Sequence, residues 1–156
     1  MAEGCTTPLA AQLDAVLADH PDVAGALDDL HTAVWRALDP TLLELTRLRI
    51  AMLLDCPTEL AARTPAATAA GLDEATIAEL ADWPRSPRFD ERQRACLDFV
   101  EQYLIDVAGM STAQTAAVAS HLGDSGLTDF ASAVLVLEQR QRLALTWDRI
   151  LGGTPT

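Results

Sequence analysis

The chain has 156 residues, which suits one domain with a sizeable hydrophobic core. Its formal net charge is −12, and all 11 basic residues are arginine. Because phosphate binding needs a basic face, this charge argues against nucleic acid and membranes as partners. A small acidic ligand stays compatible with it, since a few local arginines are enough to hold one.

The cysteine pattern indicates reduced thiols. Cys5, Cys56 and Cys96 are an odd number at irregular spacing, which is not typical of a disulfide framework. No Cys-x-x-Cys or histidine-rich pattern indicates a zinc site, and we expect neither a metal nor a cofactor. The first residues lack a signal-peptide profile, and no apolar run approaches the ~20 residues that span a bilayer. We therefore expect a cytoplasmic protein.

Helical periodicity runs through almost the whole chain, with no alternating strand pattern. The expected helices cover residues 8–19, 21–38, a segment from 40 that holds Glu44, a segment from 57 towards Gly71, 74–81, 91–108, 112–122 and 128–151. The sequence therefore predicts an all-α fold of about seven or eight helices. We expect residues 1–20 to be an N-terminal extension, 21–151 the helical domain and 152–156 a tail.

Proline, glycine and capping residues predict where these helices begin and end. Pro21, Pro40 and Pro57 each suit the first turn of a helix, because the residue before proline is pushed out of the α region. Asp90 is expected to cap the helix that follows it. The stretch Gly123–Gly126 predicts a turn before the last helix.

The segment from Leu38 to Arg63 carries the most specific pattern. Glu44 is followed twelve residues later by Cys56, and then by Glu59 and Arg63. This segment resembles the redox helices of alkylhydroperoxidase-D-like (AhpD-like) and carboxymuconolactone-decarboxylase-like proteins. In those proteins a Glu precedes Cys-x-x-Cys-x-x-x-His by the same spacing. Here Glu59 stands at the second cysteine position and Arg63 at the histidine position.

Three further stretches are similar to the same family in their order and spacing. They are the Ala-Gly-Leu-acidic stretch at 70–80, the Pro-broken loop and helix at 83–97, and the last helix at 127–143. The resemblance covers roughly residues 38–146 and implies an AhpD-like helical fold. It also implies a homo-oligomer, a trimer or a hexamer of two stacked trimers.

The chain keeps only part of the chemistry that the resemblance implies. Peroxidase relatives cycle two thiols between dithiol and disulfide, while a nearby His and Glu move protons. Cys56 is expected at a helix cap, where the backbone amides favour a thiolate and Glu59 opposes it. A disulfide within this site is excluded, because Glu59 occupies the position of the second thiol.

Two interpretations of Glu59 and Arg63 remain open. As an exposed i,i+4 pair they contribute only ~0.2–0.5 kcal/mol to helix stability. Alternatively, positions 56, 59, 60 and 63 share one helix face that turns inward, and both side chains then line a cavity with Glu44. Glu44 could equally pair with Arg47 at i,i+3.

Three hypotheses of function follow. The first is a family enzyme without dithiol chemistry, acting on a small organic acid or lactone by acid/base catalysis with Glu44, Glu59 and Arg63. The second is a non-enzymatic, oligomeric ligand-binding or scaffold relative. The third is a one-cysteine peroxide-reactive protein that uses Cys56 and an external thiol. Taken together, these hypotheses make Glu44, Cys56, Glu59 and Arg63 the candidate site residues.

Overall fold

A computed structural model describes residue 13 and residues 15–151, without the side chains of 148–151. Helices account for all the regular structure of this part, which confirms the all-α class. The elements are α2 (Pro21–Ala37), α3 (Pro40–Leu54), α4 (Pro57–Ala61), α5 (Pro65–Ala69), α6 (Glu74–Ala78), the 3₁₀ turn η1 (Leu80–Asp82), α7 (Glu91–Asp106), the 3₁₀ turn η2 (Val107–Gly109) and α8 (Thr112–Leu151). Half of the helix expected at 8–19, and Cys5, lie outside the described residues.

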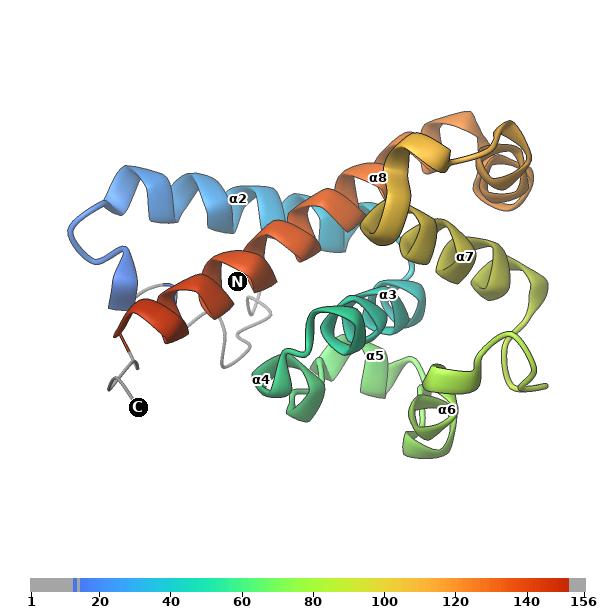
Figure 1. The fold of residues 1–156 in the computed structure, drawn as a ribbon, viewed down its shortest axis with the longest axis horizontal. Coiled ribbons are helices and arrows are strands. Elements are labelled where there is room, and N and C mark those ends of the chain that lie inside the picture. The colour runs from blue at the N-terminus through green and yellow to red at the C-terminus, as the bar shows by residue number, and fades with distance from the viewer. Residues whose placement is uncertain (1–12, 14, 152–156) are drawn as a thin grey trace.

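Helix α3 lies at the centre of the molecule. Figure 1 shows α2 and the C-terminal part of α8 running side by side in one layer, with α3 below them and α7 beside it. The short helices α4 and α5 also pack on α3. Because neighbours surround α3, it is buried on nearly every face and not along one stripe.

Two apolar clusters share α3 as their common wall. The larger one joins α2, α3, α7 and α8 and contains an edge-to-face contact between Phe99 and Phe130, with ring centroids 5.7 Å apart. The smaller one lies around Leu48, Leu80 and Trp83. Burial of these side chains is the main force that holds the helices together.

The helix starts follow the capping residues that the sequence indicates. The side chain of Asp39 accepts a hydrogen bond from the Leu42 amide, and that of Asp73 from the Thr76 amide. Asp90 and Gln93 form a reciprocal capping box at the start of α7. Proline occupies the first turn of α2, α3, α4 and α5.

The helix expected from Pro57 towards Gly71 is broken. Helix α4 has only five residues, Ala62 and Thr64 are extended, and a new five-residue helix begins at Pro65. The cause is local, because Thr64 precedes a proline and cannot remain helical. Arg63 therefore lies in a link between two helices and not on the face of Cys56 and Glu59.

The turn expected at Gly123–Gly126 involves only one residue in the structure. Only Gly123 leaves the helical region, with φ +77° and ψ 169°, and helix resumes directly after it. The part of the chain that the structure describes has seven α-helices, α2–α8, of which three have five residues each. Among the helices described here, none combines the length and apolarity that a membrane crossing requires.

Candidate functional site

Arg47 is the centre of a buried polar cluster. Its side chain on α3 is 1% exposed, and its Nε and Nη2 donate to the two oxygens of Glu44 at 2.9 and 2.8 Å. Nη1 donates to Oε2 and to the backbone oxygen of Glu59, at 2.6 and 2.7 Å. Nη2 also donates to the Ala62 carbonyl at 2.9 Å. All five N–H groups of the guanidinium thus have an acceptor.

Glu44 is equally well satisfied. Its carboxylate is 1% exposed and accepts two further hydrogen bonds, from the Thr64 amide at 3.1 Å and the Thr64 hydroxyl at 3.0 Å. Each carboxylate oxygen therefore has two donors. The cluster joins α3 to α4 and to the link before α5, which is where the helix break occurs.

The electrostatics of the cluster keep Arg47 charged. Burial by itself lowers the pKa of Arg47, but its hydrogen bonds and charge interactions with Glu44 and Glu59 outweigh that effect and raise the pKa above its usual value. A buried guanidinium between two carboxylates is a strong, directional contact. With one cation and two anions, the set carries one more negative than positive charge.

Some acceptor atoms in the cluster have no partner. Glu59 Oε1 is buried without a hydrogen bond, as is Gln141 Oε1. Gln141 reaches the cluster from α8, where its Nε2 donates to the Arg47 carbonyl at 3.0 Å. Buried acceptors without donors are uncommon and are candidates for a functional role.

The structure brings Glu44 and Glu59 together but places Arg63 elsewhere. The Nε and Nη2 of Arg63 donate to the exposed side chain of Glu74 at 2.7 and 2.9 Å. Its Nη1 donates to the Leu60 and Ala62 carbonyls, and its side chain is 30% exposed. The interpretation that Arg63 shares an inward-turned helix face with Cys56 and Glu59 is therefore wrong, because α4 ends at Ala61.

The structure confirms the pair of Glu44 with Arg47, but sequence reasoning missed the contact of Arg47 with Glu59 and the role of Thr64. The i,i+3 spacing of Glu44 and Arg47 was visible, but it also fits an exposed pair. The Thr64-Pro65 dipeptide was the signal for the helix break. The ion pair between Arg47 and Glu59 crosses twelve residues and leaves no mark in local spacing.

The two described cysteines are both buried, and neither forms a disulfide within the described chain. Cys56 is the N-cap residue of α4 and is 2% exposed. Cys96 is fully buried in the larger apolar cluster, and burial raises the pKa of its thiol to about 12. Cys96 is thus a core residue, since its thiol stays protonated at neutral pH.

Another buried polar residue, His31, lies where α2 meets α8. It is 5% exposed, and its Nε2 accepts a hydrogen bond from Trp35 Nε1 at 2.9 Å. Burial first, and then the charges of Arg140 and Arg47, lower the pKa of His31 to about 4. No three His, Cys, Asp or Glu side chains in the described part of the chain lie close enough to hold a metal ion.

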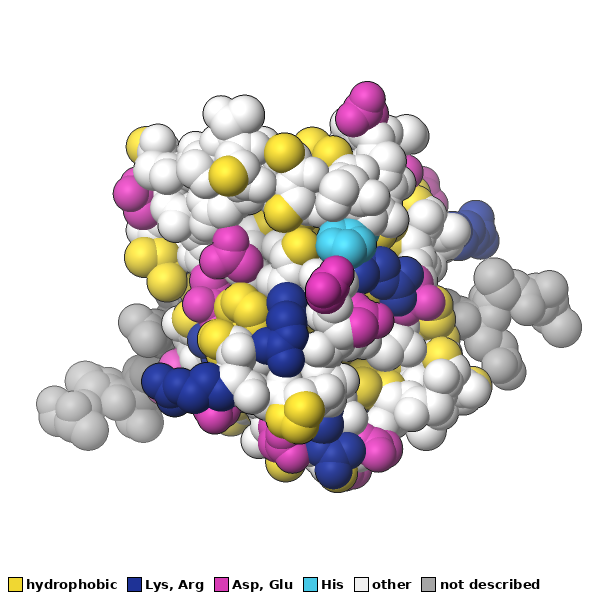
Figure 2. Space-filling model, turned by 90° about the vertical axis from the view of Figure 1, so that its right-hand side faces the viewer, with side chains coloured by type: hydrophobic (Ala, Val, Ile, Leu, Met, Phe, Trp, Pro, Cys, Tyr) yellow, Lys and Arg dark blue, Asp and Glu magenta, His cyan; other side chains and the backbone are white. Residues whose placement is uncertain are grey.

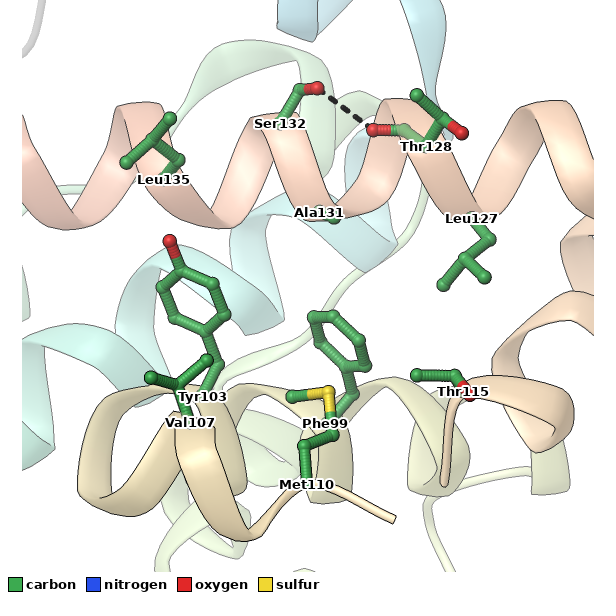
Figure 3. Close-up of a pocket in the computed structure, with 10 residues that line it drawn as sticks. All are labelled: Phe99, Tyr103, Val107, Met110, Thr115, Leu127, Thr128, Ala131, Ser132 and Leu135. Atoms are coloured by element: carbon green, nitrogen blue, oxygen red, sulfur yellow. Dashed lines mark hydrogen bonds between the residues drawn. The ribbon is translucent and has the colours of Figure 1, made fainter. Parts of the chain in front are cut away.

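A groove of about 490 Å³ lies apart from this cluster, between α7, η2 and α8 (Figure 3). Its lining is mainly apolar and contains no charged side chain. The lining residues are Phe99, Tyr103, Val107, Met110, Thr115, Leu127, Thr128, Ala131, Ser132 and Leu135. None of them was a candidate from the sequence.

Comparisons with known proteins agree with the arrangement of helices. A solved structure from Agrobacterium tumefaciens, a protein of unknown function described as a candidate antioxidant defence protein AhpD, superimposes with a TM-score of 0.74. It is 20% identical, and the match covers 90% of this chain and 96% of that chain. This likeness shows that the chain has the AhpD-like fold. No curated protein matches the sequence.

The family comparison is made on sequence. The model of the carboxymuconolactone decarboxylase family matches residues 21–102, just over half of the chain. The matched region includes α2, α3 and most of α7, and it contains Glu44, Arg47, Cys56 and Glu59. The chain belongs to the carboxymuconolactone decarboxylase family.

Proposed function

We propose that this chain is a family member without dithiol chemistry that binds a small ligand. The observation that supports the proposal is that every N–H group of Arg47 donates a hydrogen bond within the protein. Glu59, at the position of the second redox thiol in peroxidase relatives, is held by Arg47, and Glu44 has two donors on each oxygen. These groups act as an internal brace, and of the carboxylate oxygens in it Glu59 Oε1 alone has no hydrogen bond.

The geometry disfavours acid/base catalysis by Glu44 and Arg63. A general acid or base must come within ~3 Å of the proton that it transfers. Glu44 is 1% exposed with all its acceptor positions used, and Arg63 is paired with Glu74 outside the cluster. Glu44 cannot reach a substrate without breaking the brace, and Arg63 is held outside it by Glu74.

The burial of Cys56 disfavours one-cysteine peroxide chemistry. A peroxide-reactive thiol must be ionised and accessible. Cys56 is only 2% exposed, in the same region as the brace. A ligand-binding role requires no reactive thiol.

The test combines a turnover assay with a binding assay on the full chain. Alkyl hydroperoxide consumption with a dithiol-recycling system is measured for the wild type and for Cys56→Ser. We expect equal, background rates. In parallel, small neutral and acidic organic compounds are screened by thermal shift, and their mass is checked after incubation. Saturable stabilisation without chemical change supports the proposal. Peroxide consumption that Cys56→Ser abolishes contradicts it.

A second candidate, a lyase or hydrolase acting on a small organic acid or lactone, is favoured by one atom. Glu59 Oε1 is a buried acceptor without a partner, and such a group could take a proton from a substrate that enters beside α4. Lactone hydrolysis and decarboxylation are measured for the wild type, Glu59→Gln and Cys56→Ser. Turnover that is lost in Glu59→Gln and kept in Cys56→Ser supports this candidate over a binding role.

A further inference from the structure

We propose that the groove between α7 and α8 binds an uncharged aromatic or alicyclic small molecule that carries an acceptor oxygen. The inference rests on the ligand-binding function proposed above and adds the site and the class of ligand. Four features of the groove carry it: its size, its charge, its aromatic wall and its exposed rim.

The size of the groove favours a small molecule over a peptide helix. Its volume of about 490 Å³ is within the range of ~300–1,000 Å³ that small-molecule sites occupy. A helix of two turns, about 11 Å long and 10 Å across, fills roughly 800 Å³. A compound with one or two rings fits within the space between the helices.

The charge of the lining favours a neutral ligand. Of all residues in the chain 22% are charged, and the net charge is −12, yet no charged side chain lines the groove. An ionised ligand would lose hydration there without gaining a counter-ion. The groove therefore complements an uncharged molecule.

The α7 wall offers a ring platform and one available donor. The rings of Phe99 and Tyr103 are stacked, with centroids 6.2 Å apart and planes at 19°. In Figure 3 the Tyr103 hydroxyl points from α7 towards α8, and it has no hydrogen bond to another described residue. A flat ring can pack along this wall, and a carbonyl or ether oxygen can accept the Tyr103 O–H.

The opposite wall and the rim add little polarity. The hydroxyls of Thr115, Thr128 and Ser132 already donate to carbonyls of their own helix. Val107 and Leu135 stand at the rim with exposed fractions of 59% and 46%. A bound ring system would cover these side chains and gain the free energy of their burial.

The test uses two probes with the same ring system. At pH 7, 2-naphthol is neutral and 2-naphthoate is an anion. Each is titrated into the full chain while amide and methyl chemical shifts are recorded by NMR. We expect 2-naphthol to bind with shifts confined to α7, η2 and α8. We expect 2-naphthoate to bind at least about tenfold more weakly, because the groove has no counter-ion for it.

Variants locate the site. Ala131→Trp and Ser132→Trp fill the groove from α8, and Ser132 is exposed, so its replacement does not overpack the core. Both should weaken 2-naphthol binding by more than about tenfold, because the indole takes the space of the probe. Tyr103→Phe should weaken it about fivefold, the equivalent of one hydrogen bond. Ala78→Trp, at an exposed position on α6, is the matched control and should bind 2-naphthol as the wild type does.

Three outcomes overturn the proposal. One is 2-naphthol binding that survives both tryptophan variants, which contradicts the groove but not the ligand-binding function. Another is an affinity for 2-naphthoate that equals the affinity for 2-naphthol. The third is self-association of the chain that Val107→Asp abolishes, since a second copy then covers the groove. Turnover in the peroxide, lactone or decarboxylation assays contradicts the ligand-binding function, but it does not contradict the groove as a binding site.

Discussion

Arg47 is the side chain on which the polar centre depends. It is the largest fully buried side chain among the described residues and the only cation in direct contact with both Glu44 and Glu59 there. A buried ion pair gains little over a well-packed apolar core, but breaking one leaves an uncompensated buried charge. The brace is therefore a stability determinant as long as all its members are present.

The first prediction is that Arg47→Leu destabilises the protein by about 3–5 kcal/mol, because two buried carboxylates lose their cation. The free energy of unfolding is measured by urea denaturation. Arg63→Ala is the comparison, and its cost should be about 1 kcal/mol or less, because the pair with Glu74 is solvent-exposed. Equal costs for the two variants would contradict the assignment of the brace to Arg47.

His31 is the side chain that should make stability depend on pH. Its Nε2 accepts the Trp35 hydrogen bond only while that nitrogen is unprotonated, and Arg140 and Arg47 both oppose a charge on the ring. The folded pKa of about 4 lies below the ordinary value of 6.5. The unfolded chain therefore binds more protons than the folded chain between these two values.

The second prediction is that the free energy of unfolding falls as the pH drops from 6.5 to 4, with the His31 contribution fully present above 6.5. The loss should be on the order of 3 kcal/mol at pH 4. Urea denaturation at pH 7, 5.5 and 4 measures it. His31→Gln should flatten the slope between pH 6.5 and 5, where carboxylates with lowered pKa values, such as Glu79, do not yet titrate. An unchanged slope in His31→Gln would show that other groups cause it.

Gly123 is the point at which α8 changes direction. Its φ of +77° with ψ 169° lies in a region that only glycine occupies readily. A Cβ built at this position has nothing within 4 Å, so backbone strain alone would set the cost of a side chain. This single residue separates the two helical parts of α8.

The third prediction is that Gly123→Ala lowers stability by about 1–3 kcal/mol, because alanine is strained in that backbone conformation. Gly25→Ala is the matched control, since Gly25 lies inside α2 with equally open space around it. It should be neutral or stabilising by up to ~1 kcal/mol. Thermal and urea denaturation measure both variants. A stabilising effect of Gly123→Ala would mean that the bend is not required.

Several surface arginines of the molecule lie in ion pairs with acidic side chains. On the face shown in Figure 2, dark-blue arginine side chains lie beside magenta acidic ones and do not gather into a basic patch. The pairs include Arg49 with Glu101 and Arg88 with Glu79. Such pairing suits a surface that does not attract polyanions.

The fourth prediction is that the chain forms a homo-oligomer, a trimer or a hexamer, as the family resemblance implies. Val23 and Leu30 are about half exposed and lie seven residues apart on the outer face of α2. We expect this face to contribute to the interface, since apolar patches of this kind favour association. Multi-angle light scattering at micromolar concentration measures the mass. Leu30→Arg should shift it towards the monomer, and a monomeric wild type would contradict the prediction.

Much of the architecture was predictable from local signals. Asp39, Asp73 and Asp90 cap helices as their positions indicate, and Pro21, Pro40 and Pro57 each open one. The pattern from Glu44 to Glu59 indicated the family, which the family comparison shows. These signals are readable because capping and proline geometry depend only on neighbours in the chain.

The partners of the site residues were not predictable in the same way. The chain contains the Glu44–Arg47 spacing and the Thr64-Pro65 break, but local spacing does not show whether a face is buried. Packing of α3 among α2, α4, α5, α7 and α8 decided that Arg47, and not Arg63, would hold Glu59. Burial converts an ordinary i,i+3 pair into a three-residue brace, because removal from water makes every unpaired charge costly. The amino-acid order thus determined the helices and the family, while the enclosure of α3 decided which charges meet.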